Sequence, residues 1–186
     1  MKYPSGVKVN TEKIVLDNHA HRGMSLEHDL NISNEYYREK DMAYIYKKPT
    51  PIKLSKVDYK KGIIKEAFFE IPSTTDYNGI YKGKYIDYEA KETSNKTSFP
   101  LANIHTHQLK HLEAVHKHGG ISFLIVRFNT KGETYLLEEK KILDFLNNNT
   151  RKSIPYEYFK QEGYLIEEKY HPRIDYLKII DIIMEV

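Results

Sequence analysis

The chain has 186 residues, with 29 basic and 26 acidic side chains and a formal net charge of +3. This length suits one domain with a substantial core, and the small charge means that any surface for a polyanion must come from local clustering. The absence of cysteine excludes disulfides, iron–sulfur clusters and thiolate zinc sites, and without an apolar leader or a membrane-length run we expect a cytoplasmic protein with no membrane partner.

The first segment, residues 1–20, lacks strong hydrophobic periodicity and is expected to be a flexible N-terminal arm, for which nucleic-acid contact and simple disorder are both open. Residues 21–186 are expected to form a single domain. Ser25 is the predicted N-cap of a helix that runs to about Asp41. Glu27 is interpreted as a surface acid that complements the helix dipole, with a catalytic part as the alternative. The predicted buried stripe of this helix is Leu26, Leu30 and Tyr37.

A lysine-rich segment follows a short strand predicted at 42–46. Two extended runs, 52–59 and 63–71, are separated by Lys60-Lys61-Gly62, and lysines recur along both runs. A core strand does not carry lysines this often, so we expect a protruding basic β-hairpin stalk, inserted at about 52–71. A solvated edge hairpin fits the pattern equally well.

The central stretch of the sequence is a predicted β-hairpin between Thr74 and Lys91. A two-residue loop at Lys82-Gly83 is the natural turn, because glycine supplies the positive φ that the turn needs. That loop pairs residues whose numbers sum to 165, which sets Asp76 opposite Glu89 and Thr74 opposite Lys91. Side chains of the second strand alternate, with Ile86, Tyr88 and Ala90 on one face and Asp87, Glu89 and Lys91 on the other.

The two opposed carboxylates indicate a metal site. Directly opposed Cβ atoms are about 5 Å apart, and like charges at that distance destabilise a sheet. A hard divalent cation such as Mg²⁺ reverses the sign, because carboxylate and hydroxyl oxygens are its usual ligands. Lys91, on the same face, would place a fixed positive charge beside a reacting phosphate. The alternative interpretation of Asp76, Glu89 and Lys91 is a solvated polar face on an edge hairpin.

A helix is predicted from about Pro100 to His118, with Ser98 as its cap and a stop at Gly119-Gly120. Gln108 lies in the middle of its apolar stripe, where a buried amide costs free energy unless it finds partners. Gln108 is therefore a candidate ligand of a metal or a water, with a satisfied core amide as the alternative. The apolar run 121–126 follows, and parallel pairing with the preceding strand would make a strand–helix–strand unit.

Histidines gather on this helix, and His107 and His111 are four residues apart. No cysteine or obvious third ligand joins them, so a surface histidine cluster is favoured over a zinc site. The remainder of the chain is interpreted as scaffold. It has a predicted strand at 133–137 and predicted helices at 138–146, 155–161 and 174–184.

Several motifs surround the predicted hairpin. They are Arg22-Gly23-Met24, Lys47-Lys48-Pro49-Thr50-Pro51, Ser73-Thr74-Thr75-Asp76-Tyr77-Asn78-Gly79, Glu89-Ala90-Lys91-Glu92-Thr93, Lys96-Thr97-Ser98-Phe99-Pro100-Leu101, His107-Gln108 and Pro172-Arg173-Ile174-Asp175-Tyr176. The order helix, strand, D…ExK hairpin, helix, strand is that of the restriction-endonuclease-like PD-(D/E)xK nucleases. The motifs together closely resemble the RecU family of Holliday junction resolvases, from about Arg22 to the C-terminal helix.

The resemblance implies a fold, a site and an activity. The fold would be an α/β restriction-endonuclease-like core, a mixed sheet flanked by helices, with the basic hairpin as a protruding stalk. The activity would be magnesium-dependent cleavage of four-way junction DNA by a homodimer, with the recombinase RecA and the RuvAB branch-migration complex as further partners. The Mg²⁺ ligands, with Mn²⁺ as a possible substitute, would be Thr74, Asp76, Glu89 and Gln108.

Within that set, the resemblance implies that Asp76 and Glu89 are catalytic together with Lys91, which would stabilise the transition state. Candidate DNA contacts are Arg22, Lys56, Lys60, Lys61 and Lys65. Two other functions are compatible with the sequence. One is a non-catalytic junction-binding protein that modulates a recombinase, and the other is a PD-(D/E)xK nuclease that acts on other branched or duplex DNA.

Overall fold

The computed structural model describes residues 25–49, 51–69 and 74–185. The expectations for residues 1–20 and for Arg22 lie outside the described residues. Within them, the main sheet has six strands in the order β1-β4-β5-β7-β8-β10. These strands are β1 (Tyr44–Lys47), β4 (Tyr77–Tyr81), β5 (Lys84–Thr93), β7 (Ile121–Phe128), β8 (Glu133–Glu138) and β10 (Tyr164–Leu165).

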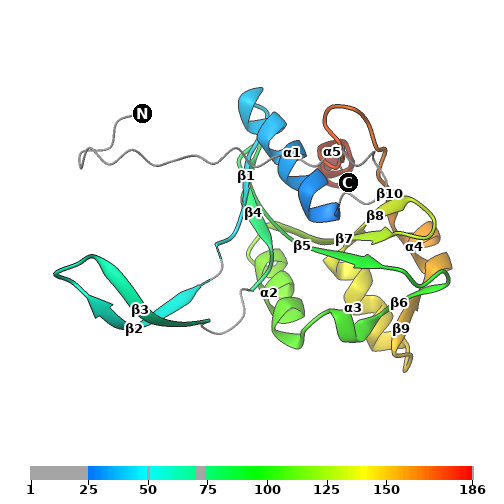
Figure 1. Ribbon diagram of the computed structural model, residues 1–186. Coiled ribbons are helices and arrows are strands. Elements are labelled where there is room, and N and C mark those ends of the chain that lie inside the picture. The colour runs from blue at the N-terminus through cyan, green and yellow to red at the C-terminus, as the bar shows by residue number, and fades with distance from the viewer. Residues whose placement is uncertain (1–24, 50, 70–73, 186) are drawn as a thin grey trace.

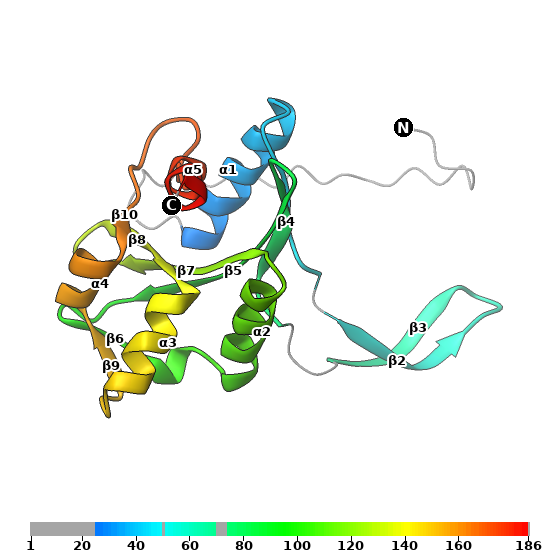
Figure 2. The same ribbon diagram turned by 180° about the vertical axis from the view of Figure 1, so that it is seen from behind.

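Helices cover both faces of this sheet, as Figures 1 and 2 show. One face carries α1 (Leu26–Glu39) and α5 (Leu177–Glu185), and the other carries α2 (Thr106–Lys117), α3 (Glu139–Asn148) and α4 (Tyr156–Glu162). β5 and β7 are parallel and joined through α2, whereas the other neighbouring pairs of the sheet are antiparallel. The predicted α/β architecture, a mixed sheet flanked by helices, is confirmed. In the described part of the chain, every helix is too short or too polar to cross a bilayer.

Each face of the sheet has its own apolar core, because alternate residues of a strand point to opposite faces. On one side, the predicted stripe of α1 is buried together with Ile86 and Tyr88 of β5. On the other side, Leu124 and Val126 of β7 belong to the core that includes Ile142 of α3. Since β5 gives Ile86 and Tyr88 to the first core, its intervening polar residues face the α2 layer.

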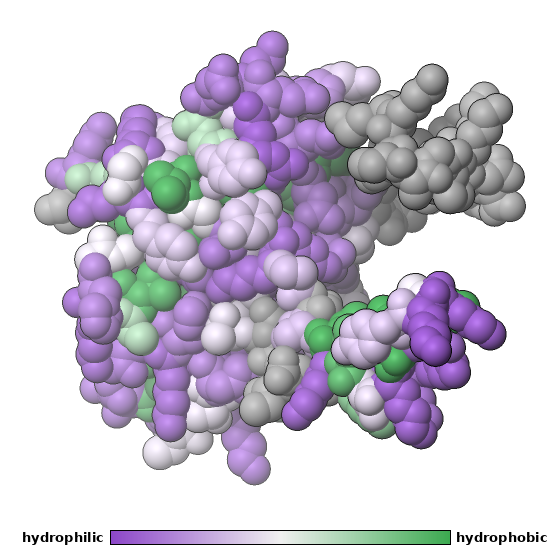
Figure 3. All heavy atoms as spheres, turned by 90° about the vertical axis from the view of Figure 1, so that its left-hand side faces the viewer, coloured by the Kyte–Doolittle hydropathy of each residue, from purple (hydrophilic) through white to green (hydrophobic). Residues whose placement is uncertain are grey.

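The predicted stalk coincides with a separate two-stranded antiparallel sheet, β2 (Ile52–Asp58) and β3 (Ile63–Phe69). It projects away from the body in Figure 1, and Figure 3 shows apolar and hydrophilic atoms side by side on its surface. An isolated two-stranded hairpin is at best marginally stable in water. This one exposes the large apolar side chains Ile52, Leu54, Ile63, Ile64 and Phe68.

The hairpin of β4 and β5 has the predicted register. Its ladder runs from Tyr77 opposite Tyr88 to Tyr81 opposite Lys84. The turn residues Lys82 and Gly83 have φ angles of 46° and 76°. The two-residue loop therefore fixes which side chains face each other across the strands.

The helix predicted from about Pro100 begins later, at Thr106, so the prediction of its start was wrong. Residues Ser98–Pro100 form β6, which pairs with β9 (Ser153–Pro155), and a 3₁₀ turn over Leu101–Asn103 follows. A proline disfavours helical backbone in the residue before it, and the pairing with β9 holds the segment extended. The helix N-cap is His105 instead of the predicted Ser98.

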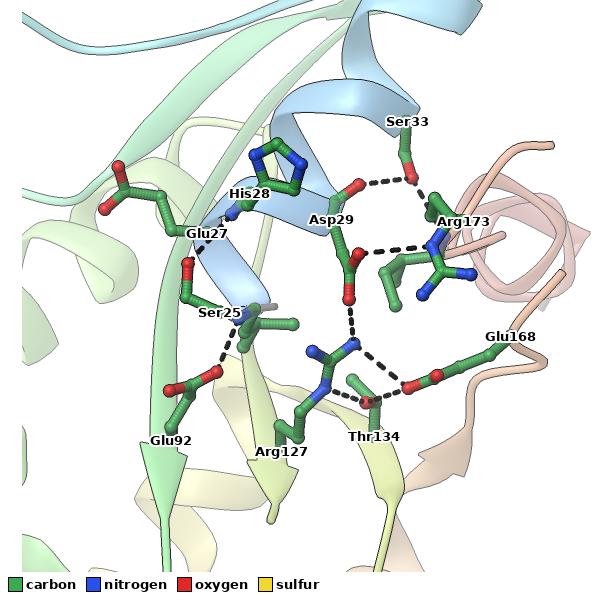
Figure 4. Close-up of polar contacts among 12 residues, drawn as sticks. Ser25, Glu27, His28, Asp29, Ser33, Glu92, Arg127, Thr134, Glu168 and Arg173 are labelled. Atoms are coloured by element: carbon green, nitrogen blue, oxygen red, sulfur yellow. Dashed lines mark hydrogen bonds and ion pairs between the residues drawn. The ribbon is translucent and has the colours of Figure 1, made fainter. Parts of the chain in front are cut away.

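The first turn of α1 is tied to the sheet by the polar contacts drawn in Figure 4. Asp29 is buried, with Arg127 Nη2 of β7 2.7 Å from its Oδ2 and Arg173 Nε 3.1 Å from its Oδ1. The backbone N of Leu26 donates to Glu92 Oε1 of β5 at 2.5 Å. These contacts set where the N-terminus of α1 lies relative to β5.

Candidate active site

The β4–β5 hairpin brings Asp76 and Glu89 together. Asp76 comes directly before β4, and its Oδ2 accepts a hydrogen bond from the backbone N of Ala90 at 3.2 Å. The Asp76 carboxylate therefore lies against β5, where its charge contributes to raising the pKa of the Glu89 carboxyl. The two residues are therefore close to each other, but the ladder begins at Tyr77, so the predicted pairs Asp76–Glu89 and Thr74–Lys91 lie beyond its end.

Glu89 is a buried carboxylate whose oxygens lack hydrogen bonds. Its exposed fraction is 0%, and neither Oε1 nor Oε2 has a hydrogen bond of good geometry with a described residue. Burial first, and then the neighbouring charge of Asp76, raise the pKa of Glu89 to about 7. A buried carboxylate without hydrogen bonds costs free energy, which a cation bound at this point would offset.

Lys91 lies two residues further along β5, on the same face. Its Nζ is 2.6 Å from Glu89 Oε1, an ion pair rather than a well-directed hydrogen bond. The Lys91 side chain keeps 24% exposure, so its ammonium group can reach a ligand in solvent. Lys91 therefore places a positive charge at the border between the two carboxylates and the solvent.

A cavity of about 260 Å³ opens beside this site, between the start of α1 and the hairpin. Asp76 and Lys91 line it from the hairpin, and Glu27 lines it from α1. The Glu27 carboxylate forms an ion pair with Lys47 of β1 at 2.5 Å. Glu27 thus behaves as a charged surface residue at the start of a helix, next to the cavity.

A second polar group of side chains, the Asp87 cluster, lies on the same face of β5. Asp87 is fully buried, and its Oδ2 is 2.7 Å from Lys48 Nζ, 2.9 Å from Tyr85 OH and 3.1 Å from His111 Nε2. Its Oδ1 accepts a hydrogen bond from the Thr75 hydroxyl. Sequence alternation places Asp87 beside Glu89, but no local spacing reveals partners that come from the end of β1 and from α2.

Two further predicted ligands, Thr74 and Gln108, have protein partners. Thr74 is exposed, and its Oγ1 accepts from Lys48 Nζ at 3.2 Å. Gln108 is buried at the start of α2, and its Oε1 accepts from the backbone N of His105 at 2.9 Å. Gln108 is thus a satisfied amide whose oxygen keeps a second lone pair for a cation.

The candidate donors fit a hard divalent cation. All of them are oxygens, from two carboxylates, a threonine hydroxyl and a glutamine amide, which is the donor chemistry that Mg²⁺ takes. Among the described residues, no three His, Cys, Asp or Glu side chains gather as a metal site. A site here would therefore need the hydroxyl and the amide. His107 is exposed, whereas His111 belongs to the Asp87 cluster.

The stalk lysines differ in their pairing. Lys56 and Lys65 form ion pairs within the hairpin, with nitrogen–oxygen distances of 2.6 and 3.3 Å. Lys60 and Lys61 are exposed at the tip and form no ion pair with a described residue. A phosphate would have to compete with an acidic side chain for the first two lysines but not for the tip lysines.

The mixed sheet, the opposed carboxylates and the following lysine together have the features of the D…ExK class of nucleases. The family model described as "RecU: Recombination protein U" matches residues 21–182. The chain belongs to the RecU family.

Two curated relatives match almost end to end. The Holliday junction resolvase RecU of Geobacillus kaustophilus (strain HTA426) is 50% identical over 192 residues, which cover 97% of this chain and 96% of the relative. The protein of the same name from Bacillus cereus (strain B4264) is 49% identical over 195 residues, which cover 98% of each. Among solved structures, the Holliday junction resolvase Hjc of Archaeoglobus fulgidus matches with 9% identity and a TM-score of 0.42, over 72% of this chain and 93% of its own.

Proposed function

We propose that this protein is a structure-selective endodeoxyribonuclease that resolves four-way (Holliday) DNA junctions by magnesium-dependent, paired symmetric nicks in recombination and repair. Membership of the RecU family and the names of the relatives support the substrate. The chemistry rests on one observation: Glu89 is a fully buried carboxylate that lies beside Asp76, and its two oxygens accept no hydrogen bond of good geometry from a described residue and have only the Lys91 ammonium group as an ion-pair partner. A cytoplasmic location and contacts with RecA and RuvAB belong to the proposal on the strength of the resemblance alone.

The proposed chemistry is hydrolysis of a phosphodiester. Thr74, Asp76, Glu89 and Gln108 would hold Mg²⁺ or Mn²⁺, which supplies polarisation of the scissile phosphate and a lower pKa for a bound water. Lys91 neutralises the charge that builds on the phosphate as water attacks, or orients that water. The attack breaks the bond between phosphorus and the 3′ oxygen, and leaves a 5′-phosphate and a 3′-hydroxyl.

Resolution of a junction needs two nicks, whereas one chain supplies one site. A homodimer with twofold symmetry is the simplest arrangement that provides both. The stalk supports it, because Leu54, Ile64 and Phe68 are 50%, 55% and 60% exposed on a hairpin that is marginal by itself. A second copy packed against these side chains would bury them.

One cleavage assay separates this proposal from its rivals. Labelled four-way junction and linear duplex are incubated with the protein, with and without Mg²⁺. Paired symmetric nicks confined to the junction and dependent on Mg²⁺ are the expected result. Cleavage of the duplex as well would favour a related nuclease with another substrate, and binding without cleavage would favour a junction-binding protein that modulates a recombinase.

Substitutions at the site test the assignment of residues. Asp76→Asn and Lys91→Ala should each lower the cleavage rate by about a hundredfold or more, because the first removes a charged metal ligand and the second removes the positive charge that stabilises the transition state. Junction binding should stay near normal, because the stalk lysines are intact. Lys84→Ala, at the exposed start of β5, is the matched control and should cut normally. Wild-type cleavage by either site variant would contradict the assignment.

A further inference from the structure

The backbone that carries Thr74 and Asp76 lies outside the sheet. The β4–β5 ladder begins at Tyr77, so residues 74–76 lack the cross-strand pairing that fixes the rest of the hairpin. A working metal site needs its ligands held to within about half an ångström. Contacts other than the ladder must therefore hold this segment.

Lys48 contacts the segment at each of its three residues. Its backbone N donates to the carbonyl oxygen of Asp76 at 2.8 Å. Its Nζ donates to Thr74 Oγ1 at 3.2 Å and to Thr75 Oγ1 at 2.5 Å. Because Lys48 directly follows β1, these contacts extend the β1–β4 pairing beyond the last pair of the ladder.

Asp87 anchors both the lysine and the segment to β5. Its Oδ2 is 2.7 Å from Lys48 Nζ, and the two side chains are 0% and 14% exposed. Its Oδ1 accepts from the Thr75 hydroxyl. Tyr85 and His111 complete its surroundings at 2.9 and 3.1 Å. One buried carboxylate thus holds the ammonium group and the middle residue of the segment together.

We propose that Lys48 and Asp87 are positioning residues of the metal site, which clamp residues 74–76 onto β5 so that Thr74 and Asp76 face Glu89. This inference rests on the metal site of the proposed function. The clamp acts through the ligands, so its loss should weaken metal binding and lower the cleavage rate by that route. Affinity for junction DNA without metal should be unchanged.

The test is the affinity for Mn²⁺, measured by electron paramagnetic resonance of the free ion with no DNA present. Lys48→Met should raise the dissociation constant about ten- to hundredfold, the usual effect of removing a residue that orients a metal ligand. Cleavage by this variant should recover as Mn²⁺ is raised, because the site is weakened but still present. A DNA-contact role for Lys48 would instead lower junction affinity and would not respond to metal.

A matched set of side chains at the other end of the hairpin provides controls. Lys82 Nζ is 2.6 Å from Asp181 Oδ1, and Tyr81 OH donates to the same oxygen at 3.0 Å. The same three residue types meet there as in the Asp87 cluster, but residues 74–76 are not involved. Lys82→Met and Asp181→Asn should leave the Mn²⁺ affinity unchanged.

A second variant keeps the test valid if Lys48→Met does not fold. That substitution leaves the buried Asp87 carboxylate without its cation, whereas Lys48→Met/Asp87→Asn removes both charges. The double variant, checked for folding by circular dichroism, should also bind Mn²⁺ at least tenfold more weakly. Mn²⁺ affinity within twofold of wild type in the folded double variant would overturn the inference.

The same titrations separate failure of the inference from failure of the site. Absence of Mn²⁺ binding by the unaltered protein, or binding that Asp76→Asn does not change, would overturn both. Binding that depends on Asp76 but survives in folded Lys48→Met would overturn the positioning role alone.

Discussion

Burial and the charge of Asp76 oppose the negative charge of Glu89 more than the nearby Lys91 ammonium group favours it. Burial and the nearby Asp76 carboxylate raise the pKa of Glu89 from an ordinary value of 4.5 to about 7. Between these two pH values the folded protein binds more protons than the unfolded chain. The free energy of unfolding therefore falls as the pH rises through this window. The full destabilisation by the ionised Glu89 carboxylate is present above pH 7.

We expect Glu89→Gln to stabilise the metal-free protein at pH 8 by up to about 3 kcal/mol, because it removes the buried charge and keeps the shape. Near pH 5 the substitution should change the free energy of unfolding much less. Urea unfolding in the presence of a chelator at both pH values measures the difference. Added Mg²⁺ should stabilise the unaltered protein but not the variant. Equal stabilities at pH 8 would contradict the burial penalty assigned to Glu89.

The sequence predicts those residues of the site that the β-hairpin places, but not the contacts between residues far apart in the chain. A two-residue turn with glycine fixes the register of the ladder from Tyr77 to Lys84, and extending that register predicts that Asp76 lies near Glu89. Lys48 and Asp87 are 39 positions apart, with the stalk between them. Their contact depends on how β1 pairs with β4, which no spacing in the sequence encodes. His111 is a second example. Its four-residue spacing from His107 suggests a zinc site, whereas its contact in the structure is Asp87 of β5.

At the scale of elements, Gly79 lets β1 lie against β4. A Cβ at Gly79 would be 2.1 Å from the carbonyl oxygen of Tyr44 and 2.5 Å from Ile45 Cα, distances that real Cβ atoms do not show. Gly83 differs, because a Cβ there would have no atom within 4 Å but its φ is +76°. Glycine is required at position 79 because a side chain would not fit, and it is favoured at position 83 because the backbone has a positive φ.

We expect Gly79→Ala to destabilise the protein by about 2–3 kcal/mol, the usual cost of forcing apart packed structure. Gly83→Ala, the control, should cost only about 1 kcal/mol, for its left-handed backbone. Because Lys48 follows β1, displacement of β1 should also weaken Mn²⁺ binding in Gly79→Ala alone. Urea unfolding and Mn²⁺ titration measure the two effects. Unchanged Mn²⁺ affinity in folded Gly79→Ala would show that the position of β1 does not influence the metal site.

Most elements follow from local patterns, and the start of α2 shows where such patterns fail. The apolar spacing of Leu101 and Ile104 is helical, yet Leu101 begins a 3₁₀ turn and Ile104 ends it. The competing influence is β9, which lies far along the chain and pairs with Ser98–Pro100. A long-range strand pairing therefore overrides a local helical spacing.

At the scale of the whole molecule, the stalk is a small hairpin with apolar side chains left exposed to solvent. It forms a sheet of its own, apart from the six-stranded sheet, and carries exposed apolar side chains on both of its strands. Its lysines are partly neutralised by acids of the same hairpin, so charge alone does not define its surface. A second copy of the chain packed against these side chains, as in the proposed homodimer, would remove them from water.

We expect Ile64→Ser/Phe68→Ser to convert the proposed homodimer to a monomer. Each large side chain that an interface buries contributes about 1.5–3 kcal/mol, so the dimer dissociation constant should rise a hundredfold or more. Analytical ultracentrifugation measures this change. The monomer should accumulate singly nicked junctions in place of paired cuts, with normal Mn²⁺ affinity. Ile182→Ser, at an exposed position of α5, is the control and should remain dimeric. A dimer with paired cutting in the folded stalk variant would place the interface elsewhere.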